Sequence, residues 1–166
     1  MRALYGRHFK ARYVAIADEI PEGSRVVDVC AGDCYLYLGF LRQKSVEYLG
    51  LDISSNLVKW AQRHAVNARA FNLWDDEVPR AEIIVMQASL YQFAPHAETV
   101  LHKLLAAAQK TVIVSEPVRN LTSSGSRVVA ALSHRLTTPT VKHGPYSGQR
   151  FDVRSLTELF HSFEPF

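Results

Sequence analysis

The chain has 166 residues, of which 48% are hydrophobic and 21% charged, and its formal net charge is +3. This length and apolar content suit one folded domain with a hydrophobic core, and they argue against a disordered chain. No stretch reaches the roughly 18 apolar residues of a membrane-spanning helix, and none has the form of a signal peptide, so we expect a cytoplasmic protein.

The two cysteines and the distribution of charge narrow the function further. Cys30 and Cys34 lie close together in sequence with no second cysteine pair, which argues against a disulfide and against a metal site. All of the excess basic charge falls beyond Pro117. This would favour an anionic ligand in that part, although ordinary surface charge is the alternative. No dense run of basic and aromatic residues occurs, so nucleic-acid binding is not expected as the main function.

Hydrophobic periodicity predicts the first elements of the chain. Apolar side chains recur at helical spacing from Tyr5 to Ile20, and Pro21 with Gly23 ends this run. A short apolar run follows and is broken by a turn that contains Gly32. In chain order we expect a helix over 5–20, a strand over 25–30, a tight turn over 31–33 and a helix over 35–41.

The same alternation of strands and helices continues up to Pro117. Ser54 or Ser55 is the predicted N-cap of the helix after the second strand. Residues 83–86 are all apolar, which predicts a central strand buried on both faces. The remaining elements expected here are strands over 46–52, 68–72, 83–86 and 111–115, a helix with Leu57, Trp60, Ala61 and His64 on one face, and a helix over 96–108.

Beyond Pro117 the pattern predicts a helix over 126–136, a loop over 138–149 and a final helix over 153–161. Strands that alternate with helices predict an α/β fold, with a doubly wound and mostly parallel sheet. We expect a single domain over 1–166. Its expected parts are an N-terminal helix or lid over 1–22, a cofactor-binding core over 23–117, and substrate-side helices and a loop over 118–166.

The first loop after a strand resembles a known cofactor motif. Ligands of open parallel sheets bind at the carboxyl ends of the strands. There, Asp28 and Gly32 are similar to the acidic residue and the central glycine of the first motif of class I S-adenosylmethionine-dependent methyltransferases, with Cys30 and Cys34 at the flanking glycine positions. Glycine would let a ligand approach the backbone closely. A plain strand-to-helix turn is the alternative.

The second strand supports this resemblance, because it ends in Asp52 at close to the offset of about 20 residues where a carboxylate meets ribose hydroxyls in such folds. A helix-capping role is the alternative for Asp52. The resemblance covers about 5–117 and implies a Rossmann-like methyltransferase fold. It places the site of S-adenosyl-L-methionine at Asp28, Cys30, Ala31, Gly32, Asp33, Asp52, Ile53, Ser54, Asn72, Leu73, Trp74, Gln87, Ala88 and Ser89, with Tyr5 and Tyr13 as further candidates.

The resemblance implies transfer of a methyl group to a small-molecule acceptor by in-line displacement, with alignment of the reactants as the main contribution of the enzyme. Where the acceptor loses a proton, a nearby carboxylate, histidine or tyrosine would take it. The candidates for this role are Tyr91, Glu116, His134 and His143. A packing or surface role is the alternative for these four residues and for Trp74, Tyr5 and Tyr13.

Two features depart from the family pattern and keep other functions open. The family adds two further strands after the fifth, so we expect missing C-terminal strands or a partner to cover the sheet edge there. Cys30 and Cys34 replace glycines, which is compatible with a catalytically silent relative that acts as a binding subunit. A nicotinamide-dependent oxidoreductase is a weaker alternative, because the spacing Gly-x-Gly-x-x-Gly is absent near Asp28.

Overall fold

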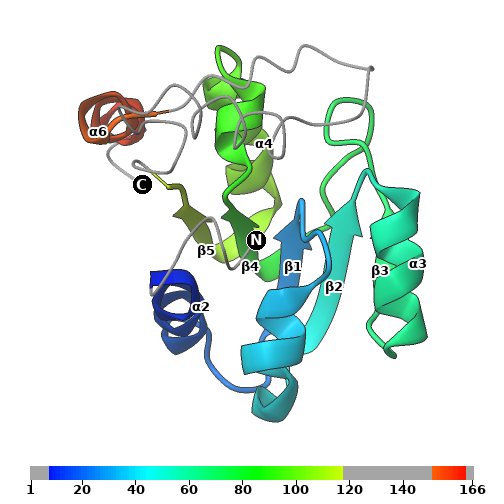
Figure 1. The fold of residues 1–166 in the computed structure, drawn as a ribbon. Coiled ribbons are helices and arrows are strands. Elements are labelled where there is room, and N and C mark those ends of the chain that lie inside the picture. The colour runs from blue at the N-terminus through cyan, green and yellow to red at the C-terminus, as the bar shows by residue number, and fades with distance from the viewer. Residues whose placement is uncertain (1–7, 118–150, 164–166) are drawn as a thin grey trace, which may run out of the picture.

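A computed structural model describes residues 8–117 and 151–163. It contains a five-stranded, all-parallel sheet in the order β3-β2-β1-β4-β5. All strands point the same way, so their carboxyl ends form one edge, uppermost in Figure 1. The strands are β1 (Arg25–Val29), β2 (Glu47–Asp52), β3 (Ala68–Ala70), β4 (Ala81–Gln87) and β5 (Ala108–Ser115).

The sheet contains a point at which the strand order reverses. β1 pairs with β2 on one side and with β4 on the other, so that Val29 lies beside both Leu51 and Met86. Loops from β1 and β4 therefore diverge toward opposite faces, and ligands of open α/β sheets bind at such a point. The predicted doubly wound parallel sheet is confirmed, and its topology favours a site at the carboxyl ends of β1, β2 and β4.

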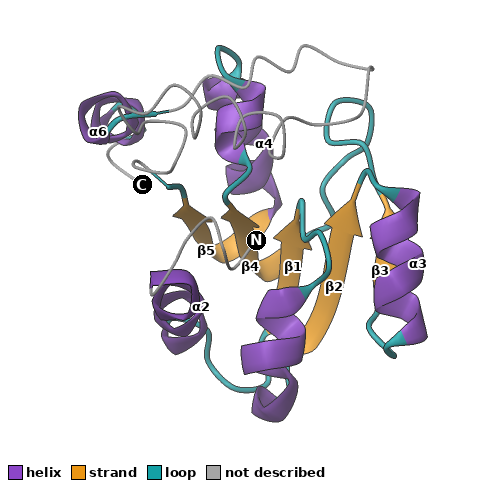
Figure 2. Cartoon of the chain, in the orientation of Figure 1, coloured by secondary structure: helices purple, strands orange, loops and turns teal. Residues whose placement is uncertain are grey.

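Helical segments cover both faces of the sheet, as Figure 2 shows. One core joins Phe9, Tyr13 and Ile16 of the first helix to the sheet, and a second core joins Val100 and Leu104 to the opposite face. The helical segments are α2 (His8–Asp18), the π-helix η1 (Tyr37–Leu41), the 3-10 helix η2 (Arg42–Lys44), α3 (Ser55–Arg63), the 3-10 helix η3 (Leu90–Phe93), α4 (Ala97–Ala107) and α6 (Val153–His161).

Packing explains where local structure departs from the expected elements. The helix expected over 35–41 becomes π-helical after Leu36, and this wider turn accompanies stacking of Phe40 on Tyr13 at 5.6 Å between ring centroids. β5 begins three residues before the expected strand over 111–115, directly after α4. The predicted burial of β4 is confirmed, as is the last helix with its bounds.

Of the four residues expected on the apolar face of the helix α3, only Ala61 is buried, so the face that packs on the sheet is rotated from the expected one. Val58 and Ala61 are buried, whereas Leu57 and Trp60 are 39% and 37% exposed. Trp60 instead stacks on His64, at 3.9 Å between ring centroids. Because β2 and β3 lie under only one side of α3, the apolar residues on its outer side stay exposed.

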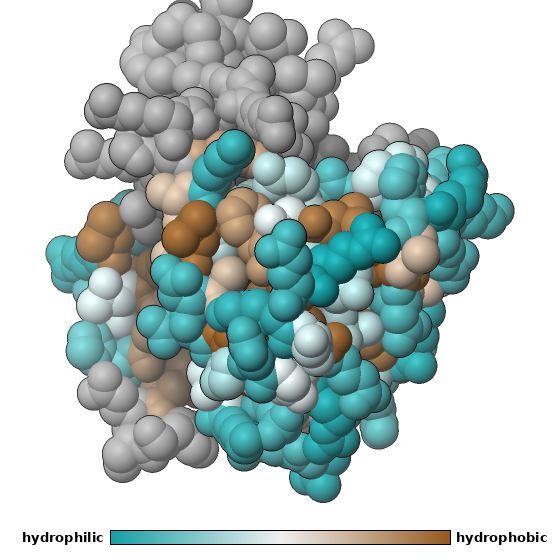
Figure 3. Space-filling model, turned by 90° about the horizontal axis from the view of Figure 1, so that it is seen from below, coloured by the Kyte–Doolittle hydropathy of each residue, from teal (hydrophilic) through white to brown (hydrophobic). Residues whose placement is uncertain are grey.

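The surface at the amino ends of the strands is mostly hydrophilic, with scattered apolar patches between polar side chains (Figure 3). Within 8–117 and 151–163, no helix has both the length and the apolar character needed to cross a membrane. The expected helix over 126–136 and loop over 138–149 lie outside the described residues.

Candidate functional site

The loop after β1 contains three residues with left-handed backbone. Cys30, Gly32 and Cys34 have φ angles of 60°, 58° and 52°. Glycine adopts this conformation without steric cost, whereas for each cysteine it costs about 1–2 kcal/mol. The turn is held by the Ala31 N–H, which donates to the Leu51 carbonyl at 2.9 Å. The loop thus keeps its conformation although two of its three left-handed positions are not glycine.

The side chain of Cys34 needs space beside β2, and Gly50 provides it. A Cβ atom built on Gly32 would meet no atom within 4 Å, so the turn faces open space at its tip. A Cβ built on Gly50 of β2 would lie only 2.6 Å from the Cys34 Sγ. The Cys34 side chain is therefore accommodated by the missing side chain of Gly50, and it does not fill the space in front of Gly32.

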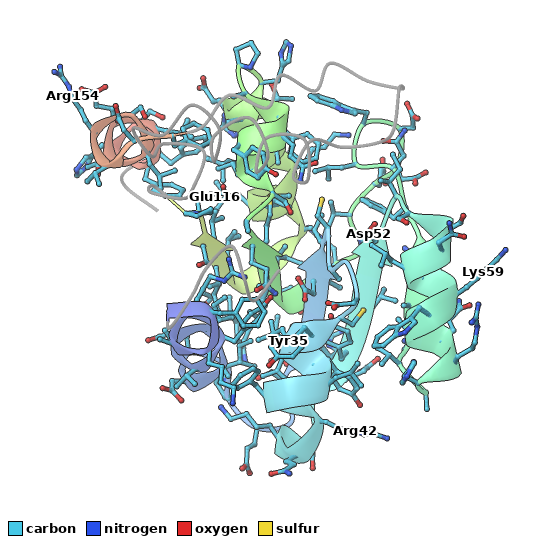
Figure 4. The ribbon with its side chains drawn as sticks, viewed as in Figure 1. Tyr35, Arg42, Asp52, Lys59, Glu116 and Arg154 are labelled. Carbon is cyan, nitrogen blue, oxygen red and sulfur yellow. The ribbon has the colours of Figure 1, made fainter. Side chains whose placement is uncertain are left out.

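Asp52 connects the end of β2 to the loop after β1. Its Oδ2 accepts the Gly32 N–H at 2.8 Å, and its Oδ1 accepts the Ser54 N–H at 2.8 Å. Figure 4 shows the residue at the upper end of β2. Burial raises the pKa of Asp52, while the two N–H groups oppose the shift. The N-cap of α3 is Ser54, whose Oγ accepts the Leu57 N–H, so Asp52 is not the capping residue.

Asp28 lies beneath the loop, fully buried within β1. Its Oδ2 accepts the Tyr48 hydroxyl at 2.9 Å and the Gln87 amide at 3.5 Å. Burial raises the pKa of Asp28 to about 7, although both hydrogen bonds act to lower it. Within the described residues, Asp28 Oδ1 and Gln87 Oε1 are buried acceptors without a hydrogen-bond partner. Such atoms normally have a partner, so this pair suits a ligand that donates hydrogen bonds.

The ends of four strands converge around Cys30. Burial raises the pKa of its thiol strongly, and the charges of Asp52, Asp28 and Glu116 raise it further, while a hydrogen bond with Ser89 opposes them. These residues come from β2, β1, the end of β5 and the loop after β4. The thiol therefore stays protonated and is a poor nucleophile. The sequence-predicted residues Asp28, Cys30, Asp52 and Ser89 lie close together at the carboxyl edge of the sheet.

The loop after β3 is organised by the side chain of Asn72. Its Oδ1 accepts the Trp74 N–H at 3.2 Å, and its Nδ2 donates to Asp75. The backbone N–H of Asn72 donates to Asp76 at 2.8 Å. Side-chain bonds of this kind are typical of turns that begin with Asn. Asn72 thus shapes the loop, and Asp75 is its direct partner.

Lys103 of α4 was not predicted from sequence, yet it also holds the loop after β3. Its Nζ donates to the carbonyls of Leu73 and Trp74 at 2.7 and 3.0 Å. The indole of Trp74 packs against the ring of Phe93, at 5.6 Å between centroids. No local pattern distinguishes Lys103 from a surface lysine, because its partners lie about 30 positions earlier in the chain. Tyr48 was missed as well, although a hydroxyl in an otherwise apolar strand is a signal of a buried partner.

The loop after β4 is held by the end of β5. Ala88 has a φ of 51°, and its N–H donates to the Ser115 carbonyl at 2.7 Å. Glu116 Oε1 accepts the N–H groups of Ser89 and Leu90 at 2.6 and 2.7 Å. Ser89 Oγ donates to the Gln87 carbonyl at 3.0 Å. The predicted residues of these two loops therefore lie together.

The other candidates have varied surroundings. Tyr91 is buried in η3. Tyr13 is buried in α2 among the rings of Phe9, Tyr35 and Phe40, and burial raises its pKa. Asp33 and Ile53 are exposed. Tyr5, His134 and His143 lie outside the described residues.

Solved structures with the same fold include S-adenosylmethionine-dependent methyltransferases. A TehB-like one from Corynebacterium glutamicum is 19% identical, with a TM-score of 0.53 over 66% of this chain and 63% of that protein. The methyltransferase in a complex with the Trm112 methyltransferase activator from Haloferax volcanii is 16% identical, with a TM-score of 0.65 over 95% and 69%. One from Thiobacillus denitrificans, in complex with S-adenosyl-L-homocysteine, is 16% identical, with a TM-score of 0.59 over 75% and 54%.

These likenesses establish the class I S-adenosylmethionine-dependent methyltransferase fold. The chain spans less than two thirds of the length of the Corynebacterium and Thiobacillus proteins. None of the curated protein sequences compared with the chain matches it. The family model described as methionine biosynthesis protein MetW matches residues 10–147, which is most of the chain. The chain therefore belongs to the MetW family of methyltransferase-like proteins.

Proposed function

We propose that the protein binds S-adenosyl-L-methionine at the carboxyl edge of its sheet and transfers the methyl group to a small-molecule acceptor. The observation that carries the proposal is the contact between Asp52 Oδ2 and the Gly32 N–H at 2.8 Å. This contact joins a carboxylate that suits the ribose diol to a turn that suits the amino-acid part of the ligand. The space in front of Gly32 is open. S-adenosylmethionine contains both a ribose and an amino acid, so it requires both of these features.

The buried acceptors near this turn support the proposal. Asp28 Oδ1 and Gln87 Oε1 lack partners within the described residues, and an amino-acid ligand carries an ammonium group that donates to such oxygens. A pKa of about 7 means that Asp28 takes its charged form readily when a cation lies beside it. The residues present therefore fit the methionine part of the cofactor as well as its ribose.

When bound, the cofactor would supply an electrophilic methyl group. The chain's own residues would hold and orient it: Asp52 by the ribose, Asp28, Gln87 and the loop around Gly32 by the amino-acid part. Ser54 and Ile53 after β2, and Leu73 and Trp74 after β3, would line the adenine. We propose the full set predicted from sequence for this site, including Cys30, Ala31, Asp33, Asn72, Ala88 and Ser89, with Tyr5 and Tyr13 as flanking contacts.

The acceptor would approach from residues 118–166, which we propose as the substrate side of a single domain. The excess basic charge of that part favours an anionic small molecule. The name of the family, which refers to methionine biosynthesis, also supports a small molecule as the acceptor. Tyr91, His134 and His143 are proposed to take a proton where the acceptor loses one. Glu116 differs from these three candidates, because its Oε1 holds the N–H groups of Ser89 and Leu90.

A binding subunit without catalysis is the second candidate. The strained cysteines at positions 30 and 34 favour it, because they occupy positions where the resembling enzymes have glycine. The Haloferax relative, whose structure was solved with an activator protein, supports a partner for the present chain as well. In that case the fold would act through a protein surface and not through methyl transfer.

Isothermal titration of the protein with S-adenosylmethionine, S-adenosylhomocysteine and NAD separates these functions. Micromolar binding of the first two ligands without binding of NAD is expected for the methyltransferase. Binding of none of them would contradict the proposal and favour the binding subunit. Binding of NAD alone would favour an oxidoreductase. Methyl transfer itself would then be measured with S-adenosylmethionine that carries a radiolabelled methyl group. The assay detects label that is transferred to small molecules in an extract, with heat-denatured protein as the control.

A further inference from the structure

The loop after β4 presents three consecutive backbone N–H groups to the end of β5. We define the β4 loop as residues 88–90. The N–H of Ala88 donates to Ser115, and the N–H groups of Ser89 and Leu90 both donate to Glu116 Oε1, at 2.6 and 2.7 Å. Ala88 is left-handed, with φ of 51°, and Ser89 follows with φ of −135°. Alternating handedness turns successive N–H groups toward the same side, where they suit an anion.

A carboxylate of the protein therefore occupies this position. Hydrogen bonds from N–H groups to a carboxylate are about twice as strong as those between neutral groups. They offset the cost of a left-handed alanine, which is about 1–2 kcal/mol. Without the carboxylate, the N–H groups of Ser89 and Leu90 would lose their acceptor in a mostly buried part of the protein.

The β4 loop connects two parts of the proposed cofactor site. On one side it follows Gln87, whose amide contacts Asp28. On the other side it leads into η3, where Phe93 packs against Trp74 of the adenine side. A change in the backbone of the β4 loop would therefore move groups at both ends of the site. Figure 4 shows Glu116 at the upper end of β5, on the opposite side of the sheet's centre from Asp52.

We propose that Glu116 is a positioning residue, which sets the β4 loop for cofactor binding through the N–H groups of Ser89 and Leu90. The inference rests on the proposed function. Its basis is that Oε1 of Glu116 accepts two consecutive N–H groups of the β4 loop and so fixes the backbone of that loop.

The test measures the affinity for S-adenosylhomocysteine by calorimetry in Glu116→Ala and Glu116→Gln, at a temperature where both are folded. We expect about tenfold weaker binding in Glu116→Ala, which corresponds to about 1.4 kcal/mol. Glu116→Gln retains an oxygen acceptor without charge, so about threefold weaker binding is expected, a partial rescue. Glu47→Gln, which changes an exposed glutamate at the start of β2, is the matched control and should bind like the unmodified protein.

A spectroscopic measurement reports on the loop without any ligand. In a Trp60→Phe background, Trp74 is the only tryptophan, and its ring lies against Phe93 of η3. Glu116→Ala should shift the emission of Trp74 to longer wavelength, whereas Glu116→Gln should shift it less and Glu47→Gln should leave it unchanged. If Glu116→Ala does not fold, the comparison of Glu116→Gln with Glu47→Gln carries the test.

The outcomes separate the inference from the proposed function. Unchanged affinity in the folded Glu116 variants, even with a lower melting temperature, would mean that Glu116 only stabilises the fold, and it would overturn the inference. If the unmodified protein binds neither S-adenosylmethionine nor S-adenosylhomocysteine, the proposed function fails and the inference fails with it. Weaker binding in Glu116→Ala with partial rescue in Glu116→Gln supports both.

Discussion

Two carboxylates at the carboxyl edge of the sheet hold neighbouring loops in different ways. Asp52, at the end of β2, distributes its two hydrogen bonds over both oxygens, one to Gly32 and one to Ser54. Glu116, after β5, receives both of its N–H groups on one oxygen. A carboxylate oxygen has two lone pairs, so each oxygen of Asp52 can still accept a hydroxyl while it holds the backbone. Asp52 can therefore contact a ligand directly, whereas Oε1 of Glu116 acts through the β4 loop.

Replacement of Asp52 should have the largest effect on cofactor binding. Asp52→Ala removes the acceptor of two ribose hydroxyls and of the Gly32 N–H, and two charge-assisted hydrogen bonds are worth about 3 kcal/mol. We expect at least about 100-fold weaker binding of S-adenosylhomocysteine by calorimetry, against about tenfold for Glu116→Ala. Asp18→Asn, at an exposed position of α2, is the control. Equal losses in the Asp52 and Glu116 variants would contradict the distinction between direct contact and support.

Packing between β2 and the loop after β1, which Asp52 joins, also requires the absence of a side chain at Gly50. Gly50→Ala would place a methyl group 2.6 Å from the Cys34 Sγ and lower the free energy of unfolding by about 1–3 kcal/mol. Chemical denaturation of the single variants and of Cys34→Ala/Gly50→Ala measures the coupling between the two positions. We expect the double variant to be more stable than the sum of the single effects predicts. Simple additivity would mean that the sulfur and Gly50 do not constrain each other.

Asp28 is buried within β1, and its burial makes the free energy of unfolding depend on pH. Its folded pKa of about 7 lies above the unfolded value of 3.8, so the folded state binds the proton more tightly. The stabilisation from this group is complete below about pH 4 and is lost as pH rises through 7. Asp28→Asn should therefore raise the melting temperature more at pH 8 than at pH 5, by several degrees. Thermal unfolding at both pH values checks this, and an equal change at both would rule out titration of Asp28.

The smallest effect is expected at Lys103, which supports the adenine side through two carbonyls. Lys103→Met keeps most of the aliphatic side chain but removes the charged donor to Leu73 and Trp74. Binding of S-adenosylhomocysteine should weaken about threefold, because the effect passes through the loop alone. Lys59→Met, whose side chain points outward from α3 in Figure 4, is the control. A loss as large as that of Asp52→Ala would instead indicate a direct role for Lys103.

Local patterns were sufficient for the order and type of most elements. The apolar run of β4 identified a strand buried on both faces, and the amphipathic pattern near the C-terminus identified α6 with its bounds. Asp28, Gly32 and Asp52 could be placed at the same edge, because the carboxyl ends of parallel strands meet there. In each case the evidence lies within one element or in the alternation of elements, which a sequence records directly.

The tertiary structure decided which groups meet across elements. Glu116 contacts residues 26 and 27 positions earlier, and Lys103 contacts residues 29 and 30 positions earlier. The inner face of α3 and the π-helical turn at η1 depended in the same way on what lies beside them. Such contacts arise from strand pairing and packing between distant segments, and no periodicity along the chain encodes them. The sequence by itself therefore determined the fold class and its candidate ligand loops, whereas packing determined which side chains support those loops.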